Sequence, residues 1–409
     1  MLTSRGVSLL LAVIILLAIA WNTDITMVYI FFVITFVMFI LAYFHMRLNM
    51  PNIEIQRTTQ ETAYEDEMLN VKIKIRNNLS RGASFFEILD YFPAAEPGKE
   101  KTSLFMLEIK AKEEINFSYS IGCYRRGVWK IGPVEIISQD ALGFFRMKKT
   151  LNVISNVLVY PALFRVFAFP PLASGSVSWM GVETAKISGD SHEFFGVREY
   201  QRGDAISRIH WPSTARHNKL IVKQFERNAI QEATIVLDLK KGNDIGAGKE
   251  TTLEYAVKIA GSIARFLMDN GAFVQLIGYT KEAMVVPFGK GESHAFKILE
   301  YLAGARSEGT YDLSQTLEEA SFITPYRSTL IAIMLDNDMD ALSSLVQFKI
   351  KGIKLIVVVL ASSTFGHTEE SEYLDAEGAK KFDEALAGLE AHIYKVSKGD
   401  DLEKIFEMV

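Results

Sequence analysis

Hydrophobic residues form two long runs with almost no charge at the start of the chain. The first run covers residues 6–23, and the second covers residues 25–46, where a proton on His45 would be the only charge. Each run has about the length that a helix needs to cross ~30 Å of hydrocarbon. Hydropathy therefore predicts two transmembrane helices within residues 1–50, joined by a tight turn at residues 22–24.

A cleaved signal peptide is the alternative for the first run, because Arg5 precedes an apolar core. Two features weigh against it: residues 18–23 contain no convincing small-x-small cleavage site, and a second full-length run follows at once. Arg5 and Arg47 flank the outer ends of the pair, whereas the connecting turn has no Lys or Arg. The positive-inside rule then predicts a multi-pass protein of the cell membrane with its soluble domains in the cytoplasm.

Alternation of apolar and polar residues follows in residues 51–160. Residues 52–59 and 69–76 alternate as strands with one buried face require. Further strand candidates occupy residues 85–92, 103–109 and 115–121. Several short strands with frequent turns predict an immunoglobulin-like β-sandwich, which we interpret as a spacer or docking module.

The period changes again in the second half of the chain. Residues 161–228 are expected to form a linker that is rich in Pro, Gly and Ser, followed by a highly charged segment. Residues 229–409 then alternate short apolar strands with amphipathic helices. This order predicts an α/β domain with a doubly wound, mostly parallel sheet, in which ligands bind at the carboxyl ends of the strands.

Composition removes several classes of partner and site. The formal net charge is −5, so nucleic acid is not an expected partner. Cys123 is the single cysteine, which excludes an internal disulfide framework and a cysteine-rich metal site. Hydrophobic residues make up 49% of the chain, as expected for a folded protein with a membrane part.

Two aspartates and a threonine are candidate ligands for a metal ion. Asp238 and Asp336 each end an apolar strand, and Thr310 lies in a loop between two helices. Von Willebrand A-like domains hold a divalent cation with such a set, and hard oxygen ligands suit Mg²⁺. That site also needs two hydroxyls after the first Asp, and here Lys240 and Gly242 replace them. We therefore favour an internal Lys–Asp pair and no cofactor, with Mg²⁺ as the alternative.

Two other motifs match known sites poorly. Gly246–Thr251 is similar to a phosphate loop, but Asn243 replaces the first Gly and Glu250 replaces the Ser or Thr after the Lys. Three histidines within residues 192–217 have no helical spacing and no cysteine beside them, so we interpret them as structural. No catalytic residues are predicted, because no nucleophile elbow or readable triad is present.

The most informative stretch is the signature segment, residues 193–226, which packs many charges around two large aromatic residues. In one interpretation, its Arg and Asp side chains form a buried ionic network that fixes the linker to the α/β domain. In the other, Arg and Trp anchor a contact with a partner protein. The residues that either role would use are Arg198, Tyr200, Gly203, Asp204, Arg208, His210, Trp211 and Arg216.

The signature segment closely resembles the core of the prokaryotic family called domain of unknown function 58. Residues 124–133 and 140–146 are also similar to that family, although Ala141 stands where Pro is common. The resemblance implies a membrane-anchored protein with a von Willebrand A-like domain. It also implies genes that commonly sit beside those of MoxR-type AAA+ ATPases.

The expected function is therefore that of a non-enzymatic adaptor or co-chaperone. Its expected partners are a MoxR-type AAA+ ATPase, a client protein whose assembly or maturation it assists, and membrane lipid. The resemblance implies no catalytic activity and no small-molecule substrate. A divalent-cation-dependent protein-binding domain of the cell envelope is the alternative.

Overall fold

The computed structural model describes residues 2–23, 25–49, 51–140, 142–175, 194–201, 204, 206–225, 230–366 and 376–407 of the chain. Both helices and strands are present, so the chain has a mixed α/β fold. The chain divides into two compact units, which are described separately below. The first comprises Met1–Leu163 with Leu299–Ala305, and the second comprises Phe164–Ile298 with Arg306–Val409.

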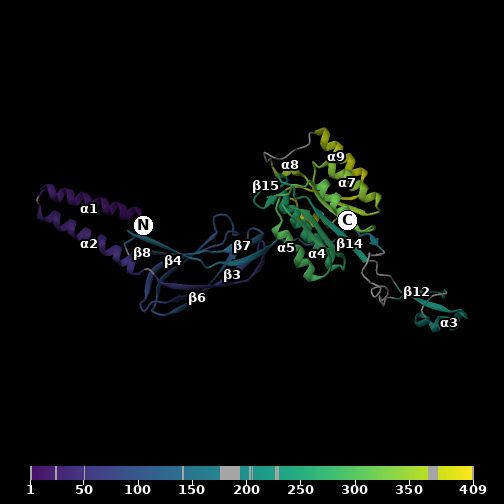
Figure 1. The fold of residues 1–409 in the computed structure, drawn as a ribbon, viewed down its shortest axis with the longest axis horizontal. Helices are drawn as coiled ribbons and strands as arrows, with labels where there is room; N and C mark the ends of the chain where they lie inside the picture. Colours follow the sequence, from purple (N-terminus) through teal and green to yellow (C-terminus); the bar gives the residue numbers. More distant parts are fainter. Residues whose placement is uncertain are drawn as a thin grey trace. The chain divides into compact units, whose positions relative to one another are not determined.

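The first unit begins with two apolar helices, α1 (Ser4–Thr23) and α2 (Thr26–Asn49), which run side by side (Figure 1). The buried residues of α1 are Gly6, Val13 and Ala20. They lie seven residues apart and so form one stripe, as expected when a helix packs one face on a neighbour. Most other apolar side chains of the pair are exposed. Both helices are long and apolar enough to cross a membrane, in agreement with the hydropathy pattern.

Antiparallel strands make up the rest of this unit, which we call the β-region. Its strands are β1 (Ile53–Thr59), β2 (Thr62–Tyr64), β3 (Met68–Asn77), β4 (Ala83–Tyr91), β5 (Lys101–Ile109), β6 (Glu114–Gly122), β7 (Gly127–Ile131), β8 (Val134–Gln139), β9 (Arg146–Leu151) and β10 (Ser155–Tyr160). They form sheets of order β1-β3-β6, β5-β4-β8-β9 and β2-β10-β7, in which only the β2–β10 pair is parallel. Alternate residues of β3 are buried along its whole length, so the pattern in residues 69–76 is confirmed.

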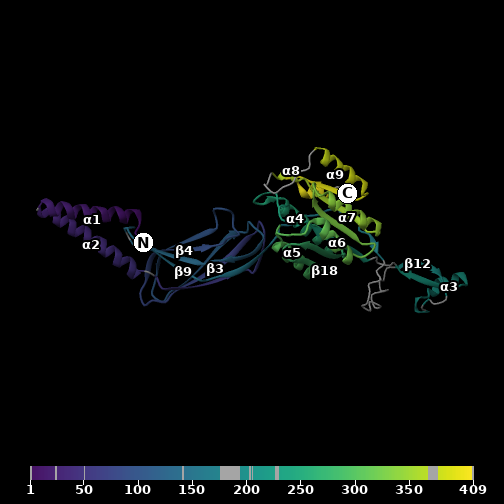
Figure 2. The same ribbon diagram turned by 45° about the horizontal axis from the view of Figure 1, so that its top comes forward.

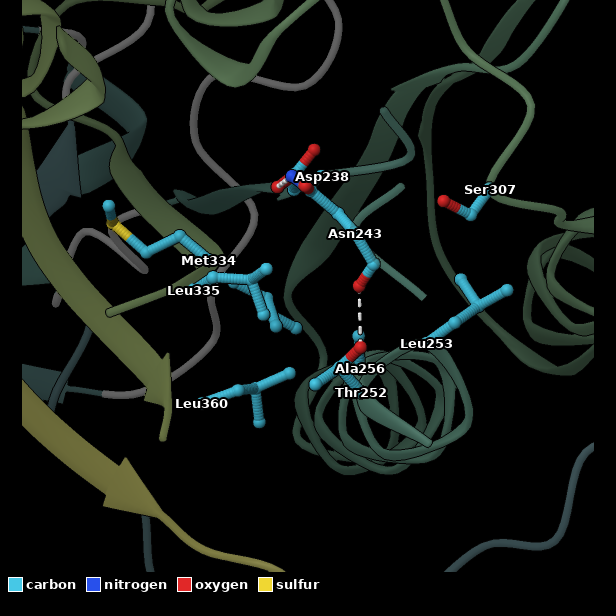
Figure 3. A pocket seen from close by; sticks show the side chains of 10 residues that line it. Asp238, Asn243, Thr252, Leu253, Ala256, Ser307, Met334, Leu335 and Leu360 are labelled. Carbon is cyan, nitrogen blue, oxygen red and sulfur yellow. Dashed lines mark hydrogen bonds between the residues drawn. The ribbon is translucent and has the colours of Figure 1, made fainter. Parts of the chain in front are cut away.

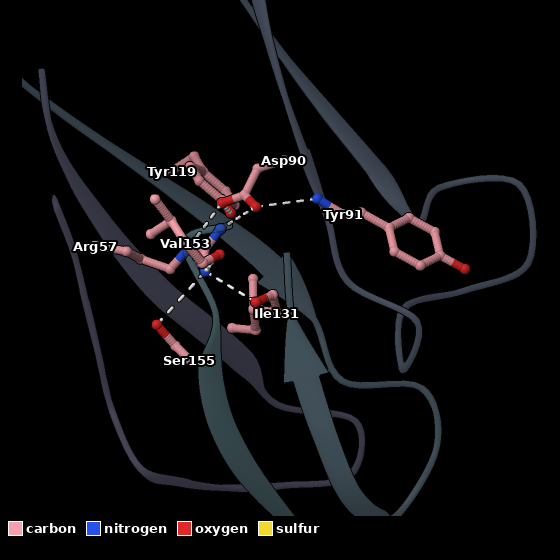
Figure 4. Close-up of polar contacts among 7 residues, drawn as sticks. All are labelled: Arg57, Asp90, Tyr91, Tyr119, Ile131, Val153 and Ser155. Atoms are coloured by element: carbon pink, nitrogen blue, oxygen red, sulfur yellow. Dashed lines mark hydrogen bonds and ion pairs between the residues drawn. The ribbon is translucent and has the colours of Figure 1, made fainter. Parts of the chain in front are cut away.

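A buried ion pair joins the sheets of the β-region (Figure 4). Arg57 of β1 and Asp90 of β4 form a two-pronged pair, and both side chains are fully buried. The remaining guanidinium nitrogen donates to the carbonyls of Ile131 and Val153, at 2.9 and 3.0 Å. The hydroxyl of Tyr119 donates to Asp90 at 2.7 Å. Burial, with the Asp90 charge beside it, raises the pKa of Tyr119, and each charge of the pair has several hydrogen-bond partners.

The second unit is built on a mixed sheet of order β18-β17-β14-β19-β20-β21, with β11 beside β14. Its strands are β11 (Ser174–Gly175), β14 (Ile230–Leu237), β17 (Phe273–Tyr279), β18 (Ala283–Gly289), β19 (Thr329–Leu335), β20 (Lys354–Leu360) and β21 (His392–Val396). All neighbours from β17 to β21 are parallel, whereas β18 and β11 pair antiparallel. The chain visits β17 and β18 on one side of β14 before it crosses to β19 on the other side.

Helices cover both faces of the mixed sheet (Figures 1 and 2). They are α4 (Thr252–Asp269), α5 (Glu292–Gly304), α6 (Leu313–Ile323), α7 (Met339–Ile350), α8 (Ser362–Phe365), α9 (Ala376–Gly388) and α10 (Leu402–Ile405). Helices α6, α7 and α9 share one core with the strands, centred on residues such as Leu317, Phe348 and Phe382. The central strands β19 and β20 are buried almost throughout, as expected for a parallel sheet covered on both faces.

The sequence pattern located these elements well, with small errors at their ends. The strands expected at residues 85–92 and 115–121 are β4, Ala83–Tyr91, and β6, Glu114–Gly122. The expected linker contributes β11, which the pattern did not indicate. Most of that linker, residues 176–193, lies outside the described residues.

Replacing Asp90 with Asn is expected to destabilise the β-region by about 3–5 kcal/mol, because it leaves the Arg57 charge buried without a counter-charge. Hydrogen–deuterium exchange of the β3 and β4 amides in the full-length protein measures the loss. The matched control is Glu114→Gln, which removes an exposed pair with Lys74 and should cost about 0–1 kcal/mol. Equal protection in both variants would show that the buried pair does not hold the sheets together.

Candidate functional site

The signature segment folds into a small unit, which we call the signature module. Strands β12 (Phe194–Glu199) and β13 (Ile221–Phe225) pair antiparallel. Between them lie a 3-10 turn, Ile206–Arg208, and helix α3, Trp211–His217. Pro212 stands in the first turn of α3, where a missing N–H costs nothing. Asn218 ends the helix in the left-handed conformation, with φ of 51°.

Ion pairs on this module lie at its surface. Arg198 grips Asp204 through two hydrogen bonds of 2.7 and 2.8 Å, and Gln201 donates its amide to the same carboxylate. The two paired side chains keep 40% and 20% of their surface exposed. Lys219 and Glu199 form a second ion pair, and their side chains are more exposed than those of Arg198 and Asp204. The buried network that one interpretation expected is therefore absent at Arg198–Asp204, and the buried ion pair of this chain's described residues is Arg57–Asp90 instead.

The remaining contacts of the module fix its backbone, whereas the side chain of Trp211 stays exposed. The amide of Tyr200 donates to the carbonyl of Leu220, and that of His210 donates to Ile221. The imidazole Nδ1 of His210 lies 2.7 Å from the hydroxyl of Ser213, in the first turn of α3. Trp211 is 62% exposed, although it begins α3.

Other candidate residues divide between exposed and undescribed positions. Arg216 is exposed on the last turn of α3, and α3 has no buried residue. Ile206 is 71% exposed beside these groups. Gly203 and the side chain of Arg208 lie outside the described residues. An exposed Trp with neighbouring Arg residues is the pattern that one finds at protein interfaces.

The second candidate region is the edge of the mixed sheet where its parallel strands end (Figure 3). Asp238 follows β14, and Asp336 follows the neighbouring strand β19, so the expected placement at the carboxyl ends is confirmed. The direction of chain winding changes on either side of β14, which is where ligands commonly bind in such sheets. We call this region the crest.

Protein groups already bind both crest aspartates. Asp238 accepts hydrogen bonds from the amide of Lys240, at 3.0 Å, and from the side-chain amide of Asn243, at 2.5 Å. Asp336 accepts from the amide and the hydroxyl of Ser362. Thr310, the third candidate ligand, is exposed. No group of three or more His, Cys, Asp or Glu with a metal-binding arrangement occurs within the part of the chain that the structure describes.

Lys240 approaches Asp238 differently from the expected Lys–Asp pair. Its backbone amide makes the contact, while its side chain is exposed and forms no ion pair within 4.0 Å among the described residues. At longer range its ammonium offsets a small part of the rise that burial causes in the pKa of Asp238 and Asp338. The sequence pattern identified Lys240 as the neighbouring charge but not the group that contacts the carboxylate.

Burial dominates the electrostatics of the crest. Loss of hydration, with a smaller contribution from the nearby Asp338 charge, raises the pKa of Asp238 to about 6, although the hydrogen bonds from Lys240 and Asn243 act in the opposite direction. Asp338 itself has a raised pKa for the same reason, in part offset by the hydrogen bond from Ala341. Sequence reasoning missed Asn243, Ser362 and Asp338. Of these three residues, only Asp338 could have been found from the sequence, because it precedes the apolar pattern of α7 as an N-cap residue does.

Asp238→Asn is expected to make the mixed-sheet unit more stable at neutral pH. The folded pKa of about 6 exceeds the ordinary value of 3.8, so the folded state holds this proton more tightly than the unfolded state does. Stability therefore falls as the pH rises from about 4 to about 6, and it stays lower above that range. Thermal unfolding of the full-length protein at several pH values should show that the variant lacks this fall. Asp269→Asn, at an exposed pair with Arg265, should keep it.

Comparison with known proteins gives a family but no described activity. Residues 196–364 match the family model described as "Protein of unknown function DUF58". A curated relative, "Uncharacterized protein YeaD" from Bacillus subtilis (strain 168), is 23% identical over 208 residues, which cover 51% of this chain and 50% of that protein. The chain thus aligns with about half the length of that relative.

Solved structures resemble only short parts of the chain. The CARDB domain of the PF1109 protein from Pyrococcus furiosus, described as a complex with di-metal ions, is 11% identical, covers 27% of this chain and 88% of its own, and has a TM-score of 0.20. Red sea bream transglutaminase is also 11% identical, covers 27% of this chain and 15% of its own, and has a TM-score of 0.19. Neither similarity identifies a fold or a ligand for this chain. Residues 196–364, which hold most of the signature module and the crest, match the DUF58 family of unknown function, and this part of the chain is assigned to that family.

Proposed function

We propose that this protein is a membrane-anchored, non-enzymatic adaptor that acts with a MoxR-type AAA+ ATPase in the assembly or maturation of a client complex. The signature module is the contact site for the partner in this proposal. The single observation that carries it is the 62% exposure of Trp211. Exposure of a large aromatic side chain to water is unfavourable, and a partner protein that covers it gains binding free energy.

The charge of the module supports a partner with an acidic surface. Residues 194–225 contain six Lys or Arg and two Asp or Glu, whereas the whole chain has a formal net charge of −5. Both acidic residues are already paired, Glu199 with Lys219 and Asp204 with Arg198. The positive charge that is left favours encounter with an acidic protein surface, and it sets orientation more than affinity.

The rest of the chain has a matching role in the proposal. Helices α1 and α2 anchor the protein in the cell membrane, and the soluble parts lie in the cytoplasm, where an ATP-dependent partner has its nucleotide. The β-region is an immunoglobulin-like sandwich that serves as a spacer. The mixed sheet is a von Willebrand A-like domain, for which the strand order and the two crest aspartates are the support. Its aspartates accept hydrogen bonds from Asn243 and Ser362.

Trp211→Ala is expected to lower capture of an AAA+ ATPase by about tenfold or more, the usual cost of removing a central Trp anchor. Full-length protein is purified from membranes under ATP-trapping conditions, and bound proteins are identified by mass spectrometry. Phe322→Ala serves as the matched control, because Phe322 is an aromatic residue with 83% exposure at another place on the chain.

Three results would decide the proposal. Capture by the wild type and by Phe322→Ala, with loss in Trp211→Ala, supports it. Recovery of no AAA+ ATPase with any form of the protein contradicts the proposed partner. Equal recovery with Trp211→Ala contradicts the signature module as the contact site.

A further inference from the structure

A short loop of the β-region is built into the base of the helix pair. Residues 140 and 142–145 belong to the connection from β8 to β9 and lie against the start of α1 and the end of α2. Phe145 is buried against Ala42 and Met46 of α2, and its ring lies 4.9 Å from that of Phe39. We call this loop, together with the helix ends that it contacts, the hairpin junction.

Backbone contacts make the hairpin junction specific. The amide of Thr3 donates to the carbonyl of Phe144 at 2.9 Å, and its hydroxyl donates to that of Gly143 at 2.6 Å. The carbonyl of Phe144 lies so near Gly6 that an added Cβ would be 2.2 Å from it. A side chain at this position of α1 would therefore push the loop away. These contacts hold the loop at one position along the axis of α1.

An apolar groove leads from the loop along α2. It has a volume of about 620 Å³ and is lined by Val33, Ile34, Val37, Met38, Leu41, Ala42, His45, Asp140 and Leu142. From Val33 to His45 the helix rises about 18 Å, close to one half of a ~30 Å hydrocarbon layer. The groove thus has the length and the lining that suit an acyl chain of one leaflet.

Asp140, the carboxylate in this lining, is buried and directed at its own loop. Its two oxygens accept the amide hydrogens of Leu142, at 3.0 Å, and Phe145, at 2.5 Å. Its charge is therefore compensated inside the loop and presents little obstacle to an anion near the mouth of the groove.

Basic side chains gather at the same end of the first unit. Arg5 and Arg47 lie at the outer ends of α1 and α2, and Arg47 reaches Tyr43. Arg81 donates to the carbonyl of Leu48, and Lys149 donates to Asn52 just past α2. None of these four cations pairs with a carboxylate of the described residues, as the ion pairs of the first unit lie elsewhere.

A run of acidic residues lies at the opposite end of the β-region. Three acidic residues in succession, Glu65, Asp66 and Glu67, form the turn between β2 and β3. The Met68 end of β3 is remote from α2, whereas its Asn77 end adjoins the residues that follow α2. This acidic turn thus lies at the end of the unit away from α2, whereas the four basic residues above lie at the end that adjoins α2.

We propose that the hairpin junction binds an anionic phospholipid. One acyl chain lies in the groove of α2, and the phosphate lies among Arg5, Arg47 and Lys149, whose donors match its oxygens. Bound lipid would hold the β-region in a defined position at the membrane surface, because the loop that contacts the lipid also carries β8 and β9. This site rests on the proposed membrane insertion of α1 and α2, but not on the adaptor role.

The test uses the full-length protein in nanodiscs that contain phosphatidylcholine with a minor share of phosphatidylglycerol. Native mass spectrometry after release from the nanodisc reports which lipids remain bound. The wild type should retain phosphatidylglycerol well above its bulk share. The triple variant Arg5→Gln, Arg47→Gln, Lys149→Gln should retain about tenfold less, since each basic residue near the surface contributes severalfold to anionic lipid binding.

The matched control is the triple variant Lys99→Gln, Lys101→Gln, Lys130→Gln, which removes three exposed cations from the other half of the β-region. It should retain lipid as the wild type does. A second variant, Val37→Trp, narrows the groove without changing charge and should also lower retention. This variant keeps the test decisive if loss of Arg5 and Arg47 disturbs insertion.

If the wild type retains phosphatidylglycerol only in proportion to its share of the nanodisc lipid, the proposed site is wrong. Two copies of the chain per nanodisc, with no retained lipid, would overturn it in favour of a second helix pair in the groove. Failure of the wild type to enter nanodiscs at all would instead contradict the membrane anchor, which separates that outcome from a failure of the lipid site.

Discussion

The apolar surface of α1 and α2 is the constraint on which the rest of this structure depends. The two helices leave most of their apolar side chains exposed, and water is a poor solvent for that much contiguous apolar area. Packing of one helix on the other uses a single stripe of α1. The remaining surface needs lipid or another protein, and the loop residues 142–145 tie the β-region to whichever environment that is.

The placement of ion pairs distinguishes the structural part of the chain from the part that is available for contact. Arg57 and Asp90 are fully buried, and the pair also contacts the carbonyls of Ile131 and Val153 and the hydroxyl of Tyr119. Arg198 and Asp204 lie near the surface of a module whose helix buries nothing. A buried pair fixes geometry because losing one partner is costly, whereas an exposed pair contributes little to stability. The Arg198–Asp204 pair is therefore expected to contribute little to the stability of the module.

The crest shows how a familiar site position can serve packing. Asp238 and Asp336 occupy the strand ends at which α/β sheets often bind ligands, yet amide and hydroxyl donors of the same chain approach their oxygens. Burial without a close counter-charge keeps the pKa of Asp238 near neutrality. Ionised Asp238 therefore lowers the stability of the folded state at neutral pH.

Sequence alone determined the elements and their order, because the signals involved are local. Length and lack of charge mark α1 and α2, a period of two marks β3, and alternation of strands with helices gives the mixed sheet. Asp238 and Asp336 were placed at strand ends for the same reason. The tertiary structure alone decided which charges meet. Arg57 and Asp90 are 33 residues apart and Thr3 and Gly143 are 140 apart, so no local pattern could pair them. Burial of a charge depends on which strands become neighbours, and that is settled only when the sheets assemble.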